Sequence, residues 1–452
     1  MSEAVISKIK EHDASLNAVV SYIDNFEPLP TGPLKGWSVA LKDNFNMKGT
    51  LTTASCNLLS NYTSIYDSHV VQLLKLSGAD LVVKTSMDEL GMGGTNLSAL
   101  TGPVHNPYDY DRISGGSSGG SAALAGKHLV RLALGSDTGD SVRKPAAYCG
   151  TIGVKPTYGR ISRYGVIPYA SSLDHVGYFV NTIEDAAQTL EVLAGRDDRD
   201  MTSSFESVPE YSKLLDMDLQ GKRIGIFKDV MDAITDPQAL ALFESFKKDL
   251  EEKGAILIEK HMSRELLVTI LPVYYTISTC EAVANHANLD GLRFGLTQEG
   301  DSLEALMTNT RTNGFSTNIK KRFIFGAFGL DDANQEEIFN KAKRIRRLIV
   351  DAYSAMISDV DVMVCLATST VAPLISGSEV DELSDQNLIA ENHMIINNFT
   401  GFPSLTQPIG KVDGMPFGIN VSAKAFDEQT LFAYAHQFES IIGWEGDFKD
   451  EL

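Results

Sequence analysis

Two segments rich in glycine and serine, and a lysine that follows an apolar stretch, are the residues of this sequence best suited to chemistry. The segments read GGSSGGSAA at residues 115–123 and GSDTGDSVR at residues 135–143, and Lys42 follows WSVAL at residues 37–41. Glycine lets a backbone turn tightly and approach a ligand closely. N–H groups that point the same way in such a turn can bind an oxyanion. The combination of both loops with a lysine predicts a catalytic site rather than two tight loops alone.

Four segments of the chain resemble the amidase signature family. They read SVALKDN at residues 38–44, GGSSGGSAA at 115–123, GSDTGDSVRKPAAYCG at 135–150 and GVKPTYGRISRYG at 153–165. The motifs are highly specific, and the resemblance covers most of the chain. It implies an amidase activity and an α/β fold of the amidase signature type, in which a central mixed β-sheet is covered by helices on both faces.

The resemblance also implies a role for each reactive side chain. Ser141 matches the nucleophile, Ser117 matches a serine that follows a cis peptide bond and relays the proton, and Lys42 matches the general base. The oxyanion hole is assigned to four backbone N–H groups, those of Thr138, Gly139, Asp140 and Ser141.

These roles require an uncharged lysine, because an ammonium group cannot accept a proton. Burial among apolar residues lowers the pKa of a lysine by disfavouring its charged form. Trp37, Val39 and Leu41 directly precede Lys42 and are expected to supply part of that burial. A serine hydroxyl becomes an effective nucleophile only when a base removes its proton.

Further segments resemble one branch of the family, the glutaminase subunits of tRNA-dependent amidotransferases. They are KTSMDE at 84–89, GPVHNP at 102–107, SSLDHVG at 171–177, LPVYY at 271–275, DGLRFG at 290–295, NGF at 313–315, KKR at 320–322 and AFDE at 425–428. In that branch, ammonia released from glutamine passes to a B subunit that amidates Glu-tRNA(Gln), and a C subunit wraps the glutaminase. ATP, Mg²⁺ and most tRNA contacts belong to the B subunit, so we expect no cofactor and no metal in this chain.

Glutamine carries a carboxylate and an ammonium group, and the resemblance suggests a partner for each. Arg322 matches a carboxylate-binding arginine and Tyr274 a nearby tyrosine, although Arg322 within KKR also fits a solvated surface charge. Glu391 aligns with the family's ammonium-binding aspartate and is longer by one methylene.

Asp140 departs from the family, which usually has glycine directly before the nucleophile. Aspartate tolerates left-handed backbone better than most residues. A carboxylate that faced the site would oppose an oxyanion. We therefore expect the side chain of Asp140 to turn outward, toward Lys144, in an exposed ion pair. Asp137 and Arg143 are expected to form a structural pair that fixes the same turn.

Three other interpretations remain open from the sequence. GGSSG at residues 115–119 also fits the G-x-S-x-G turn of α/β-hydrolases, which requires a strand directly before it and a catalytic histidine such as His286, His393 or His436. A second alternative is a stand-alone amidase that acts on other small amides. A third alternative is a non-catalytic scaffold subunit, which kept the fold and lost its activity through Asp140.

Composition narrows the location and the partners. The net charge is −20, with 59 acidic against 39 basic residues, which argues against direct nucleic-acid binding. No secretory signal and no transmembrane run are expected. The cysteines are scattered, which predicts buried free thiols in the cytoplasm rather than zinc or redox sites; they are Cys56, Cys149, Cys280 and Cys365.

Alternating strand and helix patterns must position these residues. We predict one domain over residues 1–452, with a mostly helical subregion at 195–350. The pattern predicts helices at 3–24, 67–77, 268–289 and 334–357, and a further helix that starts at Asp236-Pro237 and runs to Gly254. Strands are expected at residues 37–41, 81–83, 129–134, 223–227, 255–258 and 362–365.

Overall fold

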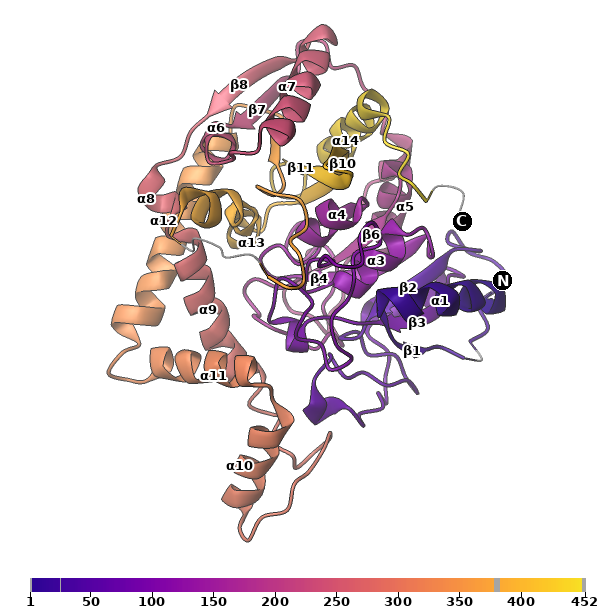
Figure 1. Ribbon diagram of the computed structural model, residues 1–452, viewed down its shortest axis with the longest axis vertical. Helices are drawn as coiled ribbons and strands as arrows, with labels where there is room; N and C mark the ends of the chain where they lie inside the picture. The colour runs from indigo at the N-terminus through magenta and orange to yellow at the C-terminus, as the bar shows by residue number, and fades with distance from the viewer. Residues whose placement is uncertain (1, 25, 378–382, 449–452) are drawn as a thin grey trace.

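The structure, a computed structural model, describes residues 2–24, 26–377 and 383–448. Its central element is one mixed β-sheet (Figure 1), and eleven strands of the described residues follow one another in it in the order β1-β3-β2-β4-β6-β5-β10-β11-β9-β7-β8. The strands are β1 (Val19–Tyr22), β2 (Ser38–Lys42), β3 (Asp80–Thr85), β4 (Leu132–Asp137), β5 (Ile152–Lys155), β6 (His175–Val180), β7 (Arg223–Phe227), β8 (Ile256–Lys260), β9 (Val362–Leu366), β10 (Ser404–Val412) and β11 (Met415–Ser422).

Helices cover both faces of this sheet. They are α1 (Ser2–Leu16), α2 (His69–Leu76), α3 (Gly119–Gly126), α4 (Arg143–Cys149), α5 (Ile183–Leu193), α6 (Lys228–Asp232), α7 (Pro237–Glu252), α8 (Arg264–Leu267), α9 (Ile270–Asn285), α10 (Leu303–Gly314), α11 (Thr317–Leu330), α12 (Lys341–Ile357), α13 (Ile396–Thr400) and α14 (Glu428–Ile442). Most helices and strands expected from the sequence are present within a few residues, which confirms the α/β class.

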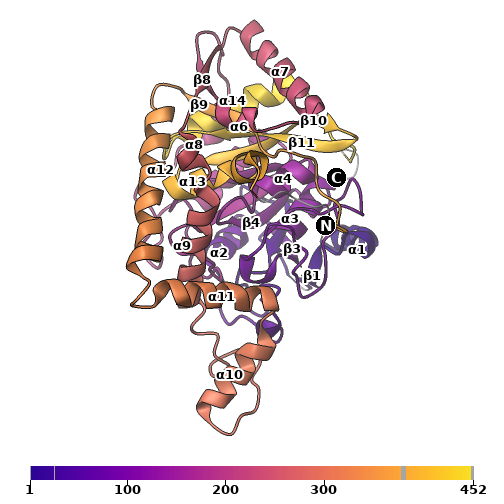
Figure 2. The same ribbon diagram turned by 60° about the vertical axis from the view of Figure 1, so that its left-hand side comes forward.

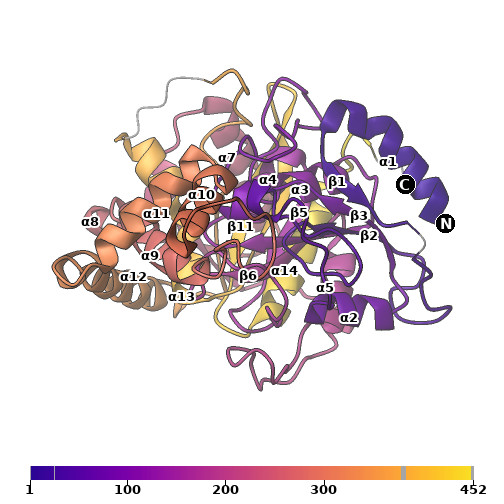
Figure 3. The ribbon, with the colours of Figure 1, turned by 90° about the horizontal axis from the view of Figure 1, so that it is seen from below.

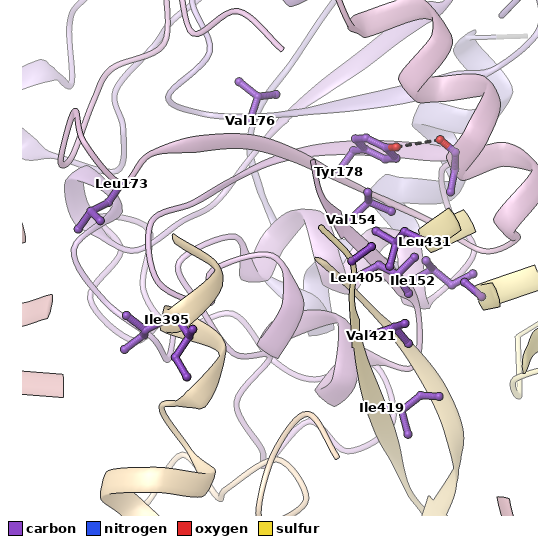
Figure 4. Close-up of a cluster of buried hydrophobic side chains, with 14 of the residues drawn as sticks. Ile152, Val154, Leu173, Val176, Tyr178, Ile395, Leu405, Ile419, Val421 and Leu431 are labelled. Carbon is purple, nitrogen blue, oxygen red and sulfur yellow. Dashed lines mark hydrogen bonds between the residues drawn. The ribbon is translucent and has the colours of Figure 1, made fainter. Parts of the chain in front are cut away.

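Each face of the sheet has its own hydrophobic core, because side chains alternate along a strand. On β4, Leu132 and Leu134 belong to the larger core, whereas Ala133 belongs to the smaller one. The smaller core packs beneath α1, α3 and α4, which contact one another through α3. The larger core lies beneath α5 and α14, and Figure 4 shows part of it, with Val154, Tyr178 and Leu431 close together.

The amino-terminal helix is shorter than the sequence predicted. Residues 3–24 were expected to form one helix, but α1 ends at Leu16 and β1 pairs with β3 as an antiparallel edge strand. Asn17 adopts a left-handed conformation with φ of 52°. The Asp13 carboxylate accepts hydrogen bonds from the N–H groups of Ala18 and Val19, at 2.7 and 3.1 Å. A side chain that takes over backbone donors in this way competes with helix propagation.

Strands β5, β6, β10 and β11 were not predicted. The β10–β11 hairpin turns through Asp413-Gly414, both with positive φ, and Val412 pairs with Met415. Asp-Gly between apolar runs is a strong local signal for such a turn. The strand expected at 129–134 is displaced, since β4 begins only at Leu132 and continues to Asp137.

Helices predominate in residues 195–350, but β7 and β8 of this range join the main sheet in parallel with β9. Figures 1 and 2 show α10 projecting from the body next to α11. In Figure 3, α1 lies on the opposite side of the molecule from α9 and α12.

One helical stretch differs from the expectation that no segment is apolar enough to cross a membrane. Among the described residues, Arg264–Asn285 passes that test by length and composition alone. Buried residues make up 44% of its most apolar window, and α9 packs against α11 and α12.

Candidate active site

Lys42 lies at the centre of a cluster of serine hydroxyls. Its side chain is fully buried, and its Nζ lies 2.8 Å from the Oγ of Ser117, 2.8 Å from the Oγ of Ser118 and 2.9 Å from the Oγ of Ser136. Asn44 donates a further hydrogen bond to the Oγ of Ser136 at 3.0 Å. Only Lys42 and Ser117 of this cluster were identified from the sequence.

Burial has a direct consequence for the charge of this lysine. It lowers the pKa of Lys42 to about 7, even though the nearby carboxylates of Asp88, Asp137 and Asp174 act in the opposite direction. A substantial fraction of Lys42 is therefore uncharged near neutral pH, and an uncharged amine can accept a proton.

The sheet brings these residues together. Strand β2 lies between β3 and β4 and is parallel to both, so the carboxyl ends of the three strands meet at one edge. Lys42 is the last residue of β2, and the loop after β4 carries residues 138–141. A site at the carboxyl ends of parallel strands is the usual arrangement in α/β folds.

The loop that carries Ser117 passes very close to other backbone. The Gly116–Ser117 peptide bond is cis, as the resemblance predicted. A Cβ atom on Gly116 would lie 2.1 Å from the Oδ2 of Asp88 and 2.7 Å from the backbone nitrogen of Asn96. Glycine is therefore required at residue 116, and helix α3 begins three residues further on.

The turn that carries Ser141 is fixed by a buried ion pair. Arg143 and Asp137 have fully buried side chains, and their Nη2 and Oδ1 atoms lie 2.9 Å apart. Burial would raise the pKa of Asp137, but the charge and hydrogen bonds of Arg143 hold it well below its ordinary value. Arg143 also donates to the carbonyl oxygen of Gly139 at 2.8 Å, which orients the peptide unit shared by Gly139 and Asp140. This pair was expected from the sequence.

Ser141 sits beside the Ser117 loop. Its side chain is 3% exposed, and its carbonyl oxygen accepts a hydrogen bond from the N–H of Ser118 at 3.2 Å. Within the described residues, the Ser141 hydroxyl makes no hydrogen bond to Ser117 or Lys42. Catalytic hydrogen bonds are often long before a substrate binds.

The backbone N–H groups of residues 138–141 are available to a ligand. None of them donates a hydrogen bond to another described residue. Asp174 helps to fix this turn, because the Oγ1 of Thr138 donates a hydrogen bond to the Oδ1 of Asp174 at 2.7 Å. Asp174 in turn accepts from the N–H groups of Tyr169 and Ala170. Asp174 and Tyr169 were not identified from the sequence as site residues.

A cavity of about 720 Å³ opens beside this turn. Gly139, Asp140, Lys144, Tyr274 and Arg322 are among the residues that line it. A Cβ atom on Gly139 would lie 3.0 Å from the Cζ of Tyr274, so the tyrosine ring packs directly against the glycine. The structure thus brings Tyr274 of α9 and Arg322 of α11 next to the nucleophile turn.

Arg322 is not a solvated surface charge. It donates a hydrogen bond to the Oη of Tyr169 at 3.1 Å and lies over the ring of Tyr275, 4.9 Å from its centroid. Its Nε is buried without a hydrogen-bond acceptor, and no described acidic residue forms an ion pair with it. A partly buried cation with a buried donor that lacks an acceptor, next to a cavity, is suited to binding an anion.

Glu391 does not line this cavity among the described residues. Its Oε1 accepts hydrogen bonds from the N–H and the Oγ of Ser369, at 2.7 and 2.5 Å. Its Oε2 lies 3.3 Å from the Nζ of Lys144, and its carbonyl oxygen accepts a hydrogen bond from the same ammonium group at 2.9 Å. The protein itself therefore occupies both carboxylate oxygens.

Asp140 differs in part from its expected position. Its Oδ2 pairs with the Nζ of Lys144 at 2.8 Å, as expected. The pair is mostly buried, however, because the two side chains are only 16% and 13% exposed. Asp140 also lines the cavity that holds Arg322. The expectation of an exposed, outward pair was wrong because Lys144 also contacts Glu391 and its side chain is mostly buried.

The three candidate histidines make other contacts. His286 packs its ring against Phe323, His393 bonds to the carbonyl oxygen of Ala390, and His436 lies next to Glu439. No described strand directly precedes residues 115–119. The hydrolase turn with a catalytic histidine is therefore wrong for this chain.

The chain belongs to the amidase family, and the profile of the Amidase family matches residues 4–432. Among curated proteins, it is similar to the A subunit of Glutamyl-tRNA(Gln) amidotransferase from Lactobacillus acidophilus, with 37% identity over 97% of this chain and 92% of that protein. It is 36% identical to the protein of the same name from Koribacter versatilis, over 98% of this chain and 94% of that protein.

Solved structures agree with this relationship. The crystal structure of the A subunit of Glutamyl-tRNA(Gln) amidotransferase from Thermotoga maritima matches with a TM-score of 0.80 and 30% identity, and covers 96% of this chain and 89% of that one. A bacterial aryl acylamidase of the amidase signature family has the same fold, with a TM-score of 0.84 over 99% of this chain and 94% of that one, at 23% identity.

Proposed function

We propose that this chain is the glutaminase subunit of a tRNA-dependent amidotransferase, and that Lys42, Ser117 and Ser141 carry out its chemistry. One observation carries the proposal: the Nζ of a fully buried lysine lies 2.8 Å from the Oγ of Ser117, beside the turn that holds Ser141. The similarity to proteins named as the A subunit of Glutamyl-tRNA(Gln) amidotransferase supports glutamine as the substrate.

In the proposed reaction, uncharged Lys42 accepts the proton of Ser117, and Ser117 accepts the proton of Ser141. The Ser141 oxygen then attacks the side-chain amide carbon of glutamine. The N–H groups of residues 138–141 stabilise the negative charge that develops on the amide oxygen. The relay returns the proton to the leaving nitrogen, and ammonia departs from an acyl-enzyme. Water, activated by the same relay, releases glutamate.

The same proposal places this chain in an amidotransferase complex with two further subunits. The ammonia passes to a B subunit that binds ATP, Mg²⁺ and most of the tRNA, while a C subunit wraps this chain. The net charge of −20 supports a tRNA contact made mainly by the partner. The described cysteines are buried and free, which supports a cytoplasmic location.

The test uses the assembled complex and two ammonia sources. We expect Ser141→Ala to abolish glutamine-dependent amidation of Glu-tRNA(Gln), while amidation with free ammonium continues, because the partner's site is untouched. Ser207→Ala, at an exposed serine, is the matched control and should retain both activities. Loss of both activities in an intact Ser141→Ala complex would contradict the proposal. Hydrolysis of simple amides but not of glutamine would point instead to a stand-alone amidase.

A further inference from the structure

The charges around the cavity beside Ser141 match the two ends of a zwitterion. Arg322 supplies a cation without an acidic partner among the described residues. Among the described residues that line this cavity, Asp140 is the one acidic side chain. The ammonium group of Lys144 also lines the cavity and is paired with Asp140 at 2.8 Å, so the charge that Asp140 offers a substrate depends on how Lys144 is shared.

The cluster formed by Asp140, Lys144 and Glu391 carries an excess of negative charge. Its single ammonium group lies between two carboxylates, 2.8 Å from the Oδ2 of Asp140 and 3.3 Å from the Oε2 of Glu391. The other oxygen of Glu391 is occupied by Ser369. Within the described residues, no donor reaches the Oδ1 of Asp140. The oxygen of this cluster that no described donor contacts is therefore the Oδ1 of Asp140.

The position of Asp140 also fits the dimensions of the substrate. In glutamine, four single bonds separate the amide carbon from the α-nitrogen, a span of roughly 4–5 Å. Asp140 directly precedes Ser141, and neighbouring Cα atoms are about 3.8 Å apart. The carboxylate that lines the cavity therefore belongs to the residue adjacent to Ser141 in the chain, on the same turn.

We propose that Asp140, held in place by Lys144, accepts the α-ammonium group of glutamine and is a specificity-determining residue of this site. The inference rests on the proposed function. It assigns to Asp140 the role that the sequence resemblance had suggested for Glu391.

The test compares glutamine with glutaramate, which is glutamine without its α-amino group, in the assembled complex. For each variant we would measure the ratio of kcat/KM for glutamine to kcat/KM for glutaramate. This ratio cancels any loss that affects both substrates alike, including damage to the oxyanion hole. Asp140→Asn and Asp140→Gly should each lower the ratio at least tenfold, because a charge-assisted hydrogen bond is lost only with glutamine.

Glu391→Gln is the matched control, since it neutralises the other carboxylate bound to Lys144. Its ratio should fall less than that of Asp140→Asn. A ratio within threefold of the wild type in both Asp140 variants would overturn the inference. So would a larger fall in Glu391→Gln than in Asp140→Asn. A wild-type complex that does not hydrolyse glutamine would overturn the proposed function together with the inference, whereas an unchanged ratio in an active glutaminase overturns the inference alone.

Discussion

The Nζ of Lys42 lies 2.8 Å from the Oγ of Ser117, although 75 positions separate the two residues in the chain. Both side chains are almost completely buried. Burial makes the uncharged form of the lysine accessible near neutral pH, and the short distance lets a proton pass between the two groups. The proposed relay depends on both features.

The first prediction concerns the proton relay. Lys42→Ala and Ser117→Ala should each reduce glutamine hydrolysis by about 10²–10⁴-fold, because each removes a group that transfers the same proton. The double variant should be little worse than either single variant, since residues that act as a unit are not additive. Ammonia release measures the effect. Lys48→Ala, at an exposed lysine, should remain fully active, and near-normal turnover in Lys42→Ala would exclude the relay.

The second prediction concerns pH. Because the pKa of Lys42 is about 7 and only its uncharged form accepts a proton, kcat/KM should rise with pH through about 7 and level off above it. Ser136→Ala removes an oxygen that accepts from Lys42. The ammonium form loses stabilisation, so the rise should move to lower pH by about one unit. Ser121→Ala serves as the control, because the Ser121 hydroxyl bonds to Thr85 and Leu134 and not to Lys42. Its pH profile should match that of the wild type. A profile that stays flat between pH 5 and 9 would argue against a titrating lysine.

The third prediction concerns the carboxylate of the substrate. Arg322→Ala should raise KM for glutamine by about tenfold or more, since charge-assisted hydrogen bonds contribute about 1.5–3 kcal/mol. A simple amide without an α-carboxylate should be affected much less. Steady-state kinetics on both substrates decide the outcome. Lys321→Ala changes the exposed neighbour of Arg322 and should leave both substrates unaffected. Equal losses on the two substrates would show that Arg322 does not bind the α-carboxylate of glutamine.

The fourth prediction concerns stability. Arg143→Met leaves the buried Asp137 carboxylate without its ion-pair partner, which should lower the free energy of unfolding by about 3–5 kcal/mol. Lys213→Met breaks an exposed pair with Glu210 and should lower the free energy of unfolding far less, because solvent screens that pair. Urea unfolding of both variants provides the comparison, and equal costs would show that burial does not matter for this pair.

The fifth prediction concerns how the stability contributed by the Asp137–Arg143 pair depends on pH. The folded-state pKa of Asp137 lies below its ordinary value of 3.8. The stability that this pair contributes is therefore fully present above about pH 4 and is lost as the pH falls below it. The difference in unfolding free energy between the wild type and Arg143→Met should shrink in that range, and a difference that stays constant down to pH 2 would contradict this assignment.

Local signals in the sequence determined several elements of the fold. Asp236-Pro237 predicted the start of a helix, and α7 begins there, with the Asp236 carboxylate accepting hydrogen bonds from Gln238 and Ala239. The prediction succeeded because capping involves residues only two or three positions apart. The apolar residues 37–41 likewise predicted the strand that ends in Lys42.

The sequence also identified the residues proposed for the chemistry, since their motifs are specific to one family. It did not reveal Ser118, Ser136 or Asn44 as neighbours of Lys42. Ser136 lies near Lys42 and Asn44 because β2 and β4 run parallel in one sheet, and Ser118 lies near Lys42 because α3 packs against both strands. Residue spacing contains no information about that pairing.

Only the tertiary structure decided how the charges beside Ser141 are shared. From the sequence, Asp140 was expected to point into solvent and Glu391 to bind the substrate. In the fold, Ser369 and Lys144 contact the oxygens of Glu391, while Asp140 shares Lys144 with Glu391 and lines the cavity. The strength of an ionic contact depends on burial and on the nearest donors. Both are set by packing between distant segments, so the sequence alone determined which charged residues are present but not how they pair or which of them lines the cavity.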